Sequence, residues 1–220
     1  MEPLIREVPS AVGERLRISE IFLSLQGEST LVGLPTVFVR LTGCPLRCQY
    51  CDSEYAFRGG QVMEANAVVA RVAAYQVGHV TVTGGEPLVR KELPEIVRRL
   101  DALPGIRDLS LSTNASRMAS FAGELKAAGI TRLNVSLDSL DPDRFKQITG
   151  GDLRRVVTGI EAAQRAGFAP IGEVPGREIV FGVVGRFWKL TGDLDSGGEF
   201  ETVQIRCEDK SIVNRIEIVH

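Results

Sequence analysis

Between residues 64 and 166 the chain alternates short apolar runs with longer amphipathic ones, and this alternation restricts the fold more than any other feature. The short runs begin at His79, Asp108 and Leu133 and are rich in β-branched residues or alternate in polarity. Helical periodicity covers residues 64–76, 91–102, 117–128 and 152–166, with a shorter helix capped by Asp141. Strands that alternate with helices of this length predict βα units and a parallel sheet.

Two further strands are expected upstream, at residues 17–25 and 36–41. Right-handed crossovers curl such a series toward a barrel, but the units are too few for eight. We therefore expect an α/β fold, an incomplete (partial) TIM-like βα barrel over residues 1–170, with its site at the C-terminal strand ends.

Residues 171–220 are punctuated by glycines, and we expect a C-terminal segment of uncertain fold that packs on the same domain. Runs at residues 179–184, 200–206 and 212–219 have the composition of strands.

Charge and hydropathy limit the partners of this chain. It carries 26 basic and 28 acidic residues, and no long basic run that would track a phosphate backbone, so nucleic acid is not an expected partner. The N-terminus lacks the apolar core of a signal peptide, and the apolar run near the C-terminus is too short to cross a bilayer. We expect a cytoplasmic protein with no membrane partner.

Three of the four cysteines, Cys44, Cys48 and Cys51, lie in one short loop after the strand at residues 36–41. Three thiolates spaced in this way can bind three irons of one [4Fe–4S] cluster and leave the fourth iron open. The open iron can take the amino and carboxylate groups of S-adenosylmethionine. One electron from the cluster then yields a 5′-deoxyadenosyl radical, so the motif predicts radical chemistry.

Zinc is the competing interpretation of the cysteine loop, because zinc also binds soft thiolates. Zinc requires a fourth ligand, and neither His79 nor His220 lies in a zinc-type pair. The aromatic Tyr50 directly before the third cysteine favours the cluster, and Tyr50 and Asp52 are expected to contact the cofactor. The isolated Cys207 is interpreted as a small buried hydrophobe.

The sequence Thr83-Gly84-Gly85-Glu86-Pro87 follows the strand that begins at His79. Two glycines allow a backbone to approach a ligand closely, because no Cβ atom intervenes. Backbone carbonyls and the Glu86 region can then accept hydrogen bonds from the ammonium group of S-adenosylmethionine. The alternative is that these residues form an ordinary turn between strand and helix. Because the sequence lies one βα unit after the cysteine loop, a role in binding the cofactor is favoured.

These residues resemble the radical S-adenosylmethionine superfamily. Within it, residues 18–29, 36–44 and 51–57 are similar to 7-carboxy-7-deazaguanine synthase, a likeness that covers about residues 16–95. The resemblance implies a lyase that converts 6-carboxytetrahydropterin to 7-carboxy-7-deazaguanine, on the route to queuosine and other 7-deazapurines. It also implies Mg²⁺, an electron donor such as flavodoxin, and a homodimer.

Carried over to this chain, the resemblance assigns substrate and metal contacts. Arg40 would bind the pterin carboxylate, Thr83 would contact the substrate, Gly85 the S-adenosylmethionine, and the Ser53 hydroxyl would bind Mg²⁺. The remaining pterin contacts would be Leu25, Gln26, Gly27 and Glu28. Without the resemblance, the residues around Gln26 would be interpreted as a polar turn, and Arg40 as the partner of a surface carboxylate.

The middle of the chain is similar to a different family, the GTP 3′,8-cyclases of molybdenum-cofactor biosynthesis. Residues 111–116, 125–140 and 144–150 carry this likeness, within about residues 105–168. It implies that Ser112 or Thr113, and Ser136, face S-adenosylmethionine. The synthase family's Glu-Thr-Ser-Gly sequence is absent near residues 111–114, and the cyclase family's second cysteine triplet is absent as well. The synthase is the main hypothesis, and a GTP cyclase or a non-catalytic module that binds a cluster or S-adenosylmethionine are the alternatives.

Overall fold

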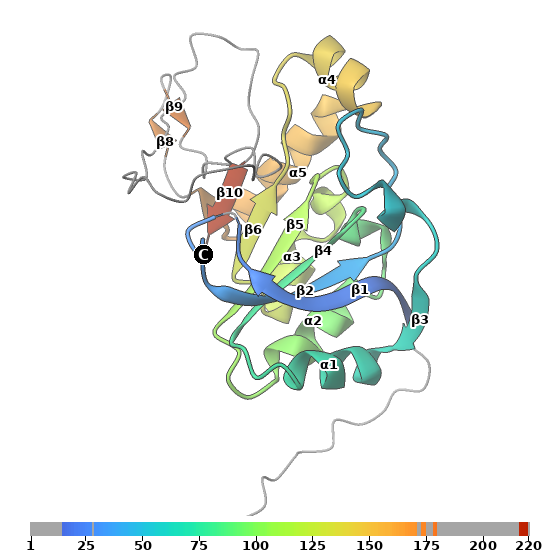
Figure 1. Ribbon diagram of the computed structural model, residues 1–220. Helices are drawn as coiled ribbons and strands as arrows, with labels where there is room; N and C mark the ends of the chain where they lie inside the picture. Colours follow the sequence, from blue (N-terminus) through green and yellow to red (C-terminus); the bar gives the residue numbers. More distant parts are fainter. Residues whose placement is uncertain (1–14, 28, 171–172, 175–177, 180–215, 220) are drawn as a thin grey trace, which may run out of the picture.

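The computed structural model describes residues 15–27, 29–170, 173–174, 178–179 and 216–219, and one mixed β-sheet forms its centre (Figure 1). Its strands are β1 Arg15–Leu25, β2 Pro35–Leu41, β3 Gln61–Glu64, β4 His79–Gly84, β5 Asp108–Thr113, β6 Arg132–Val135, β7 Ala169–Pro170 and β10 Ile216–Val219. They lie in the order β3-β1-β2-β4-β5-β6-β10-β7. A separate two-stranded sheet pairs β8 Glu173–Val174 with β9 Glu178–Ile179.

The four central strands β2, β4, β5 and β6 are parallel, so their carboxyl ends meet at one edge of the sheet. The flanking strands are antiparallel: β1 pairs with β2, β3 with β1, and β10 with both β6 and β7. A short parallel series with helical crossovers is the expected incomplete TIM-like barrel, and the predicted fold class is confirmed.

Five α-helices accompany the sheet. They are α1 Ala65–Ala73, α2 Leu93–Asp101, α3 Ala122–Ala128, α4 Pro142–Thr149 and α5 Leu153–Arg165. The predicted helix over residues 117–128 is split into a 3₁₀ turn at Met118–Ser120 and the α-helix α3, because Phe121 between them leaves helical backbone geometry. As predicted, Asp141 caps α4: its carboxylate accepts a hydrogen bond of 2.7 Å from the Arg144 N–H. None of the helices in the described part of the chain is long and apolar enough to cross a membrane.

Other boundaries differ from the sequence-based expectation. The pattern did not indicate β3, a short edge strand, and β6 ends at Val135 rather than Leu137. Of the strands expected near the C-terminus, residues 216–219 form β10 and Ile179 ends β9. The one expected at residues 200–206 lies outside the described residues. Because β10 pairs with β6, this part of the C-terminal segment extends the main sheet; the division at residue 170 stays a prediction.

The two faces of the parallel strands differ in chemistry because successive side chains point to opposite sides. In β4, Val80 and Val82 are 0% and 1% exposed and belong to the core packed against the helices. The other face, which we call the polar face, carries the alternate residues of β2, β4, β5 and β6. They are Thr36, Phe38 and Arg40; His79, Thr81 and Thr83; Asp108, Ser110 and Ser112; Arg132 and Asn134. A strand face that is almost wholly polar, and whose residues are all buried or partly buried, points to a binding surface rather than to a packing surface.

Candidate radical cofactor site

The cysteine loop begins where β2 ends and is attached to the C-terminus of α4 (Figure 1). The backbone N–H groups of Arg47 and Gln49 donate to the carbonyls of Thr149 and Ile148, each at 3.0 Å. The last carbonyls of a helix have no partner within it, so this loop satisfies them from outside. The attachment fixes the loop against an element about one hundred residues further along the chain.

All three loop cysteines are free and partly buried. Burial raises the pKa of the Cys44 thiol, and burial together with the nearby Asp138 carboxylate raises the pKa of Cys48 to about 11. The thiols lie close enough that each of these two pKa values is also raised by neighbouring cysteines. Cys44 and Cys48 are therefore protonated at neutral pH and must release protons on binding a metal.

The donor set fits an iron–sulfur cluster better than zinc. Three thiols of one loop are the ligands that a cluster with one open iron requires. His79, the histidine considered as a fourth zinc ligand, begins β4 and lies 3.2 Å (Nδ1) from the Pro35 carbonyl, whereas the cysteine loop adjoins the other end of that strand. Among the described residues no three His, Cys, Asp or Glu side chains already stand in a metal-binding arrangement. The thiols must therefore reorient to converge on a cluster.

The sequence analysis predicted that Gly84 and Gly85 let a ligand approach the backbone. In the structure these glycines allow the end of β4 to lie close to the start of the cysteine loop. The Gly85 N–H donates to the Leu41 carbonyl at 3.2 Å, and the Glu86 N–H donates to the Gly43 carbonyl at 2.7 Å. A Cβ atom on Gly84 would lie 2.6 Å from the Leu41 nitrogen, and one on Gly85 would lie 3.0 Å from the Cys44 Cβ. The glycines therefore have a structural role in placing the cysteines, whatever they bind.

The Glu86 side chain is 1% exposed and already has three hydrogen-bond donors within the protein. Its carboxylate accepts hydrogen bonds from the Leu88 N–H, the Thr113 hydroxyl and the Asn114 N–H, at 3.0, 2.7 and 2.7 Å. Burial raises the pKa of this carboxyl, while these donors lower it. The carboxylate thus joins the ends of β4 and β5, and the expectation that this region binds an ammonium group stays a prediction.

The other predicted cofactor contacts lie near the same edge of the sheet. Ser112 is on the polar face, whereas Thr113 points to the helix side and bonds to Glu86, so Ser112 is the better placed of this pair. Ser136 directly follows β6, and its N–H donates to the Thr113 carbonyl at 2.9 Å. Tyr50 is 56% exposed beside Cys48, and Asp52 accepts from the Ser53 hydroxyl at 2.6 Å.

Arg40 is held on the polar face chiefly by Glu20, Phe22 and Tyr55, which the sequence analysis did not single out. Its Nε lies 2.7 Å from Glu20 Oε1, and its guanidinium carbon is 5.6 Å from the centres of both the Phe22 and Tyr55 rings. The Tyr55 hydroxyl in turn donates to Glu20 at 2.7 Å. Arg40 Nη1 also lies 3.4 Å from the Ser53 hydroxyl. The period of two in β1 could have indicated that Glu20 and Phe22 lie on one face of the strand. Only the strand register shows that they lie opposite Arg40 and Phe38.

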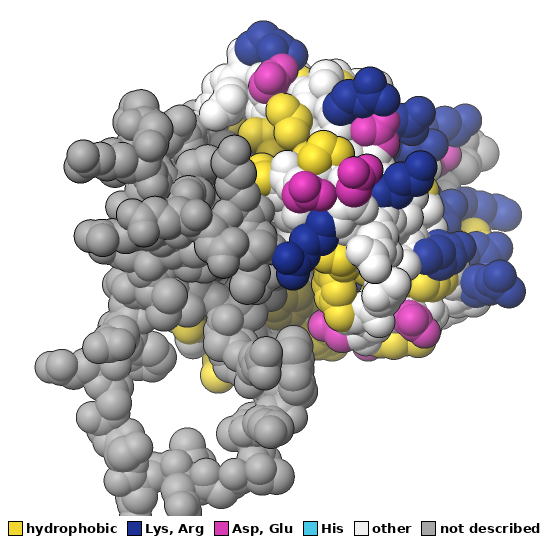
Figure 2. All heavy atoms as spheres, turned by 90° about the horizontal axis from the view of Figure 1, so that it is seen from above, with side chains coloured by type: hydrophobic (Ala, Val, Ile, Leu, Met, Phe, Trp, Pro, Cys, Tyr) yellow, Lys and Arg dark blue, Asp and Glu magenta, His cyan; other side chains and the backbone are white. Residues whose placement is uncertain are grey.

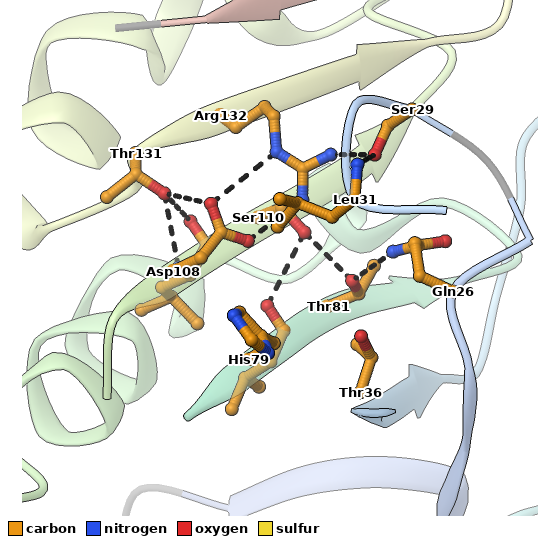
Figure 3. Close-up of polar contacts among 12 residues, drawn as sticks. Gln26, Ser29, Leu31, Thr36, His79, Thr81, Asp108, Ser110, Thr131 and Arg132 are labelled. Carbon is orange, nitrogen blue, oxygen red and sulfur yellow. Dashed lines mark hydrogen bonds and ion pairs between the residues drawn. The ribbon is translucent and has the colours of Figure 1, made fainter. Parts of the chain in front are cut away.

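Gln26 does not join Arg40, although the sequence analysis assigned both to one substrate. Its amide Nε2 donates to the Thr81 hydroxyl at 3.1 Å, and Thr81 bonds to Ser110 at 2.8 Å (Figure 3). Because β1 is antiparallel to β2, Leu25 pairs with Pro35 at the amino end of β2, about 16 Å of strand from Arg40. The direction of β1 separates the backbones of Gln26 and Arg40, and a shared substrate site for their side chains stays a prediction.

The loop after β1 instead closes the amino end of the barrel. Figure 3 shows Ser29 of this loop next to Arg132 of β6, which also forms an ion pair of 2.8 Å with Asp108. Arg132 is 3% exposed, so this network is an internal floor. Leu25, by contrast, is 63% exposed, and Glu28 lies outside the described residues.

Figure 2 shows the end of the molecule opposite to this floor. Apolar, acidic and basic side chains lie side by side on it, and Lys and Arg side chains gather along one border. An open hollow of about 590 Å³ between the 3₁₀ turn and α5 is lined by Ser116, Arg117, Ala119, Ser120, Phe121, Asp152, Arg154, Arg155 and Thr158. None of the predicted site residues lines it, so we do not assign it to the cofactor.

Comparisons with known proteins indicate the superfamily of this chain. The model of the Radical SAM superfamily matches residues 38–181. GTP 3′,8-cyclases of Pseudomonas putida (strain GB-1) and Listeria monocytogenes serovar 1/2a are 47% identical over 132 residues and 44% identical over 135 residues. These matches cover 57% and 58% of this chain but only 39% and 40% of the relatives, so the chain spans about two fifths of their length.

Among solved structures, QueE from Escherichia coli is 26% identical, with a TM-score of 0.38 over 46% of this chain and 54% of that one. The likeness to the cyclases confirms one of the two resemblances noted in the sequence. The family model covers well over half of the chain and includes the cysteine loop, the two glycines and the parallel strands. The chain therefore belongs to the Radical SAM superfamily.

Proposed function

We propose that this radical SAM enzyme acts on a substrate with a 2-amino-4-oxopyrimidine ring, and that GTP is the first candidate. The identity of 44–47% to GTP 3′,8-cyclases over 132–135 residues is the observation that carries this proposal. It outweighs the shorter likeness to 7-carboxy-7-deazaguanine synthase that the sequence analysis ranked first.

Cys44, Cys48 and Cys51 would hold a [4Fe–4S] cluster. When bound there and reduced, the cluster supplies the electron that cleaves S-adenosylmethionine to a hydrogen-abstracting radical. The chain's own residues position the site: α4 holds the loop, the close approach of Gly84 and Gly85 fixes its start, and Glu86 joins the neighbouring strand ends. Gly84, Gly85 and Ser136 at these strand ends, with Ser112, are proposed contacts of S-adenosylmethionine.

The second candidate substrate is 6-carboxytetrahydropterin, which has the same pyrimidine ring. Arg40 favours it, because a guanidinium next to Thr83 on the polar face suits a carboxylate. The hydrogen bond of the Gln26 amide to Thr81 counts against it. Binding of Mg²⁺ by Ser53 is proposed only together with this substrate. The positive charge of the Arg40 guanidinium, which lies close to the Ser53 hydroxyl, would repel the metal ion. An electron donor such as flavodoxin, and a homodimer, are proposed on the same resemblance.

The test is turnover by the anaerobically reconstituted protein with S-adenosylmethionine and dithionite. We expect 5′-deoxyadenosine to form above the substrate-free background with GTP, and a smaller or absent response with 6-carboxytetrahydropterin. The opposite preference, lost on removal of Mg²⁺, would favour the synthase. Background cleavage with both substrates would overturn the proposal and indicate a binding module without productive chemistry.

Arg40→Lys separates substrate binding from the radical chemistry. Lysine keeps the charge but loses the planar fork and the stacking between Phe22 and Tyr55, so we expect KM for the anionic substrate to rise roughly tenfold. Iron content and kcat should change little. The control is Arg15→Lys, whose exposed ion pair with Glu64 lies on the edge pair β1–β3. An unchanged KM in Arg40→Lys would remove Arg40 from the substrate site.

A further inference from the structure

Asn134 is a buried amide with nothing in the described protein to bind. It lies in β6 between Leu133 and Val135, which are 0% and 1% exposed and belong to the core, so its side chain points to the polar face. Asn134 is 2% exposed, and neither its oxygen Oδ1 nor its nitrogen Nδ2 has a hydrogen-bond partner among the described residues. Buried polar groups are almost always paired, so such an exception calls for an explanation.

The strand register places Asn134 in a row with the proposed substrate residues. Arg40 pairs with Thr83, and Ser112 pairs with Asn134. Val82 pairs with Leu111, which sets Thr83 beside Ser112. One row of polar side chains therefore crosses the four parallel strands, close to their carboxyl ends. Its span is three strand spacings, about 14 Å.

Both ends of this row have unsatisfied polar atoms. Arg40 Nε is close to Glu20, but its N–H is not directed at that carboxylate and has no partner in hydrogen-bond geometry. Three of the four buried unpaired side-chain atoms found in the described residues thus belong to Arg40 and Asn134. A ligand that lay along the row, with an anionic group near Arg40 and a ring near Asn134, would satisfy all three.

We propose that Asn134 is the residue that binds the substrate's 2-amino-4-oxopyrimidine ring, an inference that rests on the proposed function. A primary amide presents one acceptor and two donors. Its oxygen can accept from the 2-amino group, while its NH₂ donates to the unprotonated ring nitrogen beside that group. The serine and threonine hydroxyls of the row cannot form such a paired contact, because each has a single polar atom.

Binding to the cluster-loaded protein with S-adenosylmethionine tests the role of Asn134 directly. The probes are 6-carboxypterin and 6-carboxylumazine, which differ only in the 2-amino and 2-oxo substituents, and GTP with ITP as a second pair. We expect the wild type to bind the 2-amino member of a pair at least tenfold more tightly, because the other leaves a buried group unpaired. In Asn134→Leu this ratio should fall to about one.

The same variant separates a binding role from a structural one. Leucine fills similar space and removes two unpaired buried atoms, so its Tm without ligand should rise by roughly 5 °C. Should Asn134→Leu fail to fold, Asn134→Ala provides the same ratio test. Asn66→Leu on α1, away from the polar face, is the matched control and should keep the wild-type ratio.

A ratio that is unchanged in a folded, iron-loaded Asn134 variant would overturn the inference, and so would a wild type that does not distinguish the paired probes. The proposed function can fail separately. If the wild type distinguishes the probes through Asn134 but turns over neither substrate, the ring-binding role stands and the proposed reaction is wrong. If it turns over GTP and Asn134 variants retain the ratio, the reaction stands and the role of Asn134 is wrong.

Discussion

Replacing Cys48 by serine should remove the iron from this protein and, with it, cleavage of S-adenosylmethionine. The Cys48 thiol is one of three in a single loop, and a serine hydroxyl is a hard, weakly acidic ligand that suits iron–sulfur clusters poorly. We expect iron to fall from about four atoms per chain to less than one. The visible absorbance of the cluster and the 5′-deoxyadenosine signal should fall to background together.

Cys207→Ser is the matched control, because it makes the same exchange at the cysteine outside the loop. It should keep the iron content and the cleavage of S-adenosylmethionine. Full iron in Cys48→Ser would exclude the loop as the cluster site. About eight irons in the wild type, reduced to about four by Cys207→Ser, would instead indicate a second cluster.

Replacing Gly84 by alanine should destabilise the protein about as strongly as any single methyl group can. The added Cβ would lie 2.6 Å from the Leu41 nitrogen and 2.8 Å from its carbonyl carbon, and would clash with the carbonyl oxygen. Gly84 also has a φ of 140°, a conformation that residues with a Cβ atom rarely adopt. Overpacking and backbone strain together should lower the free energy of unfolding by about 3 kcal/mol or more.

Chemical denaturation of the purified variants measures this loss, and we expect a markedly lower midpoint or an insoluble protein. The control is Gly123→Ala in α3, where a Cβ atom would have no neighbour within 4 Å. Alanine favours a helix over glycine, so this control should gain up to about 1 kcal/mol. Equal midpoints for Gly84→Ala and the wild type would show that β4 does not approach β2 as closely as described.

The sequence alone was sufficient for features that depend on neighbours along the chain. The period of two in β4 and the period of 3.6 in α5 predicted these elements to within a residue or two of their bounds. Asp141 and Gly129 marked helix ends because capping requires a side-chain acceptor at one end and a left-handed residue at the other. The three cysteines indicated a cluster because all its ligands come from one loop.

Only the tertiary structure decided what residues distant in sequence do together. Gln26 and Arg40 are close in the chain, but the reversal of direction between β1 and β2 gives them different partners: Gln26 bonds to Thr81, and Arg40 lies against Glu20. Glu86 was expected near the cofactor, yet the end of β5 supplies two of the donors that its carboxylate binds. Asn134 lies in a stretch similar to the cyclases, but the sequence did not mark it as a site residue, because its role depends on the register of four strands and on its unpaired side-chain atoms. Strand direction and register are properties of the assembled sheet, so no local pattern contains them.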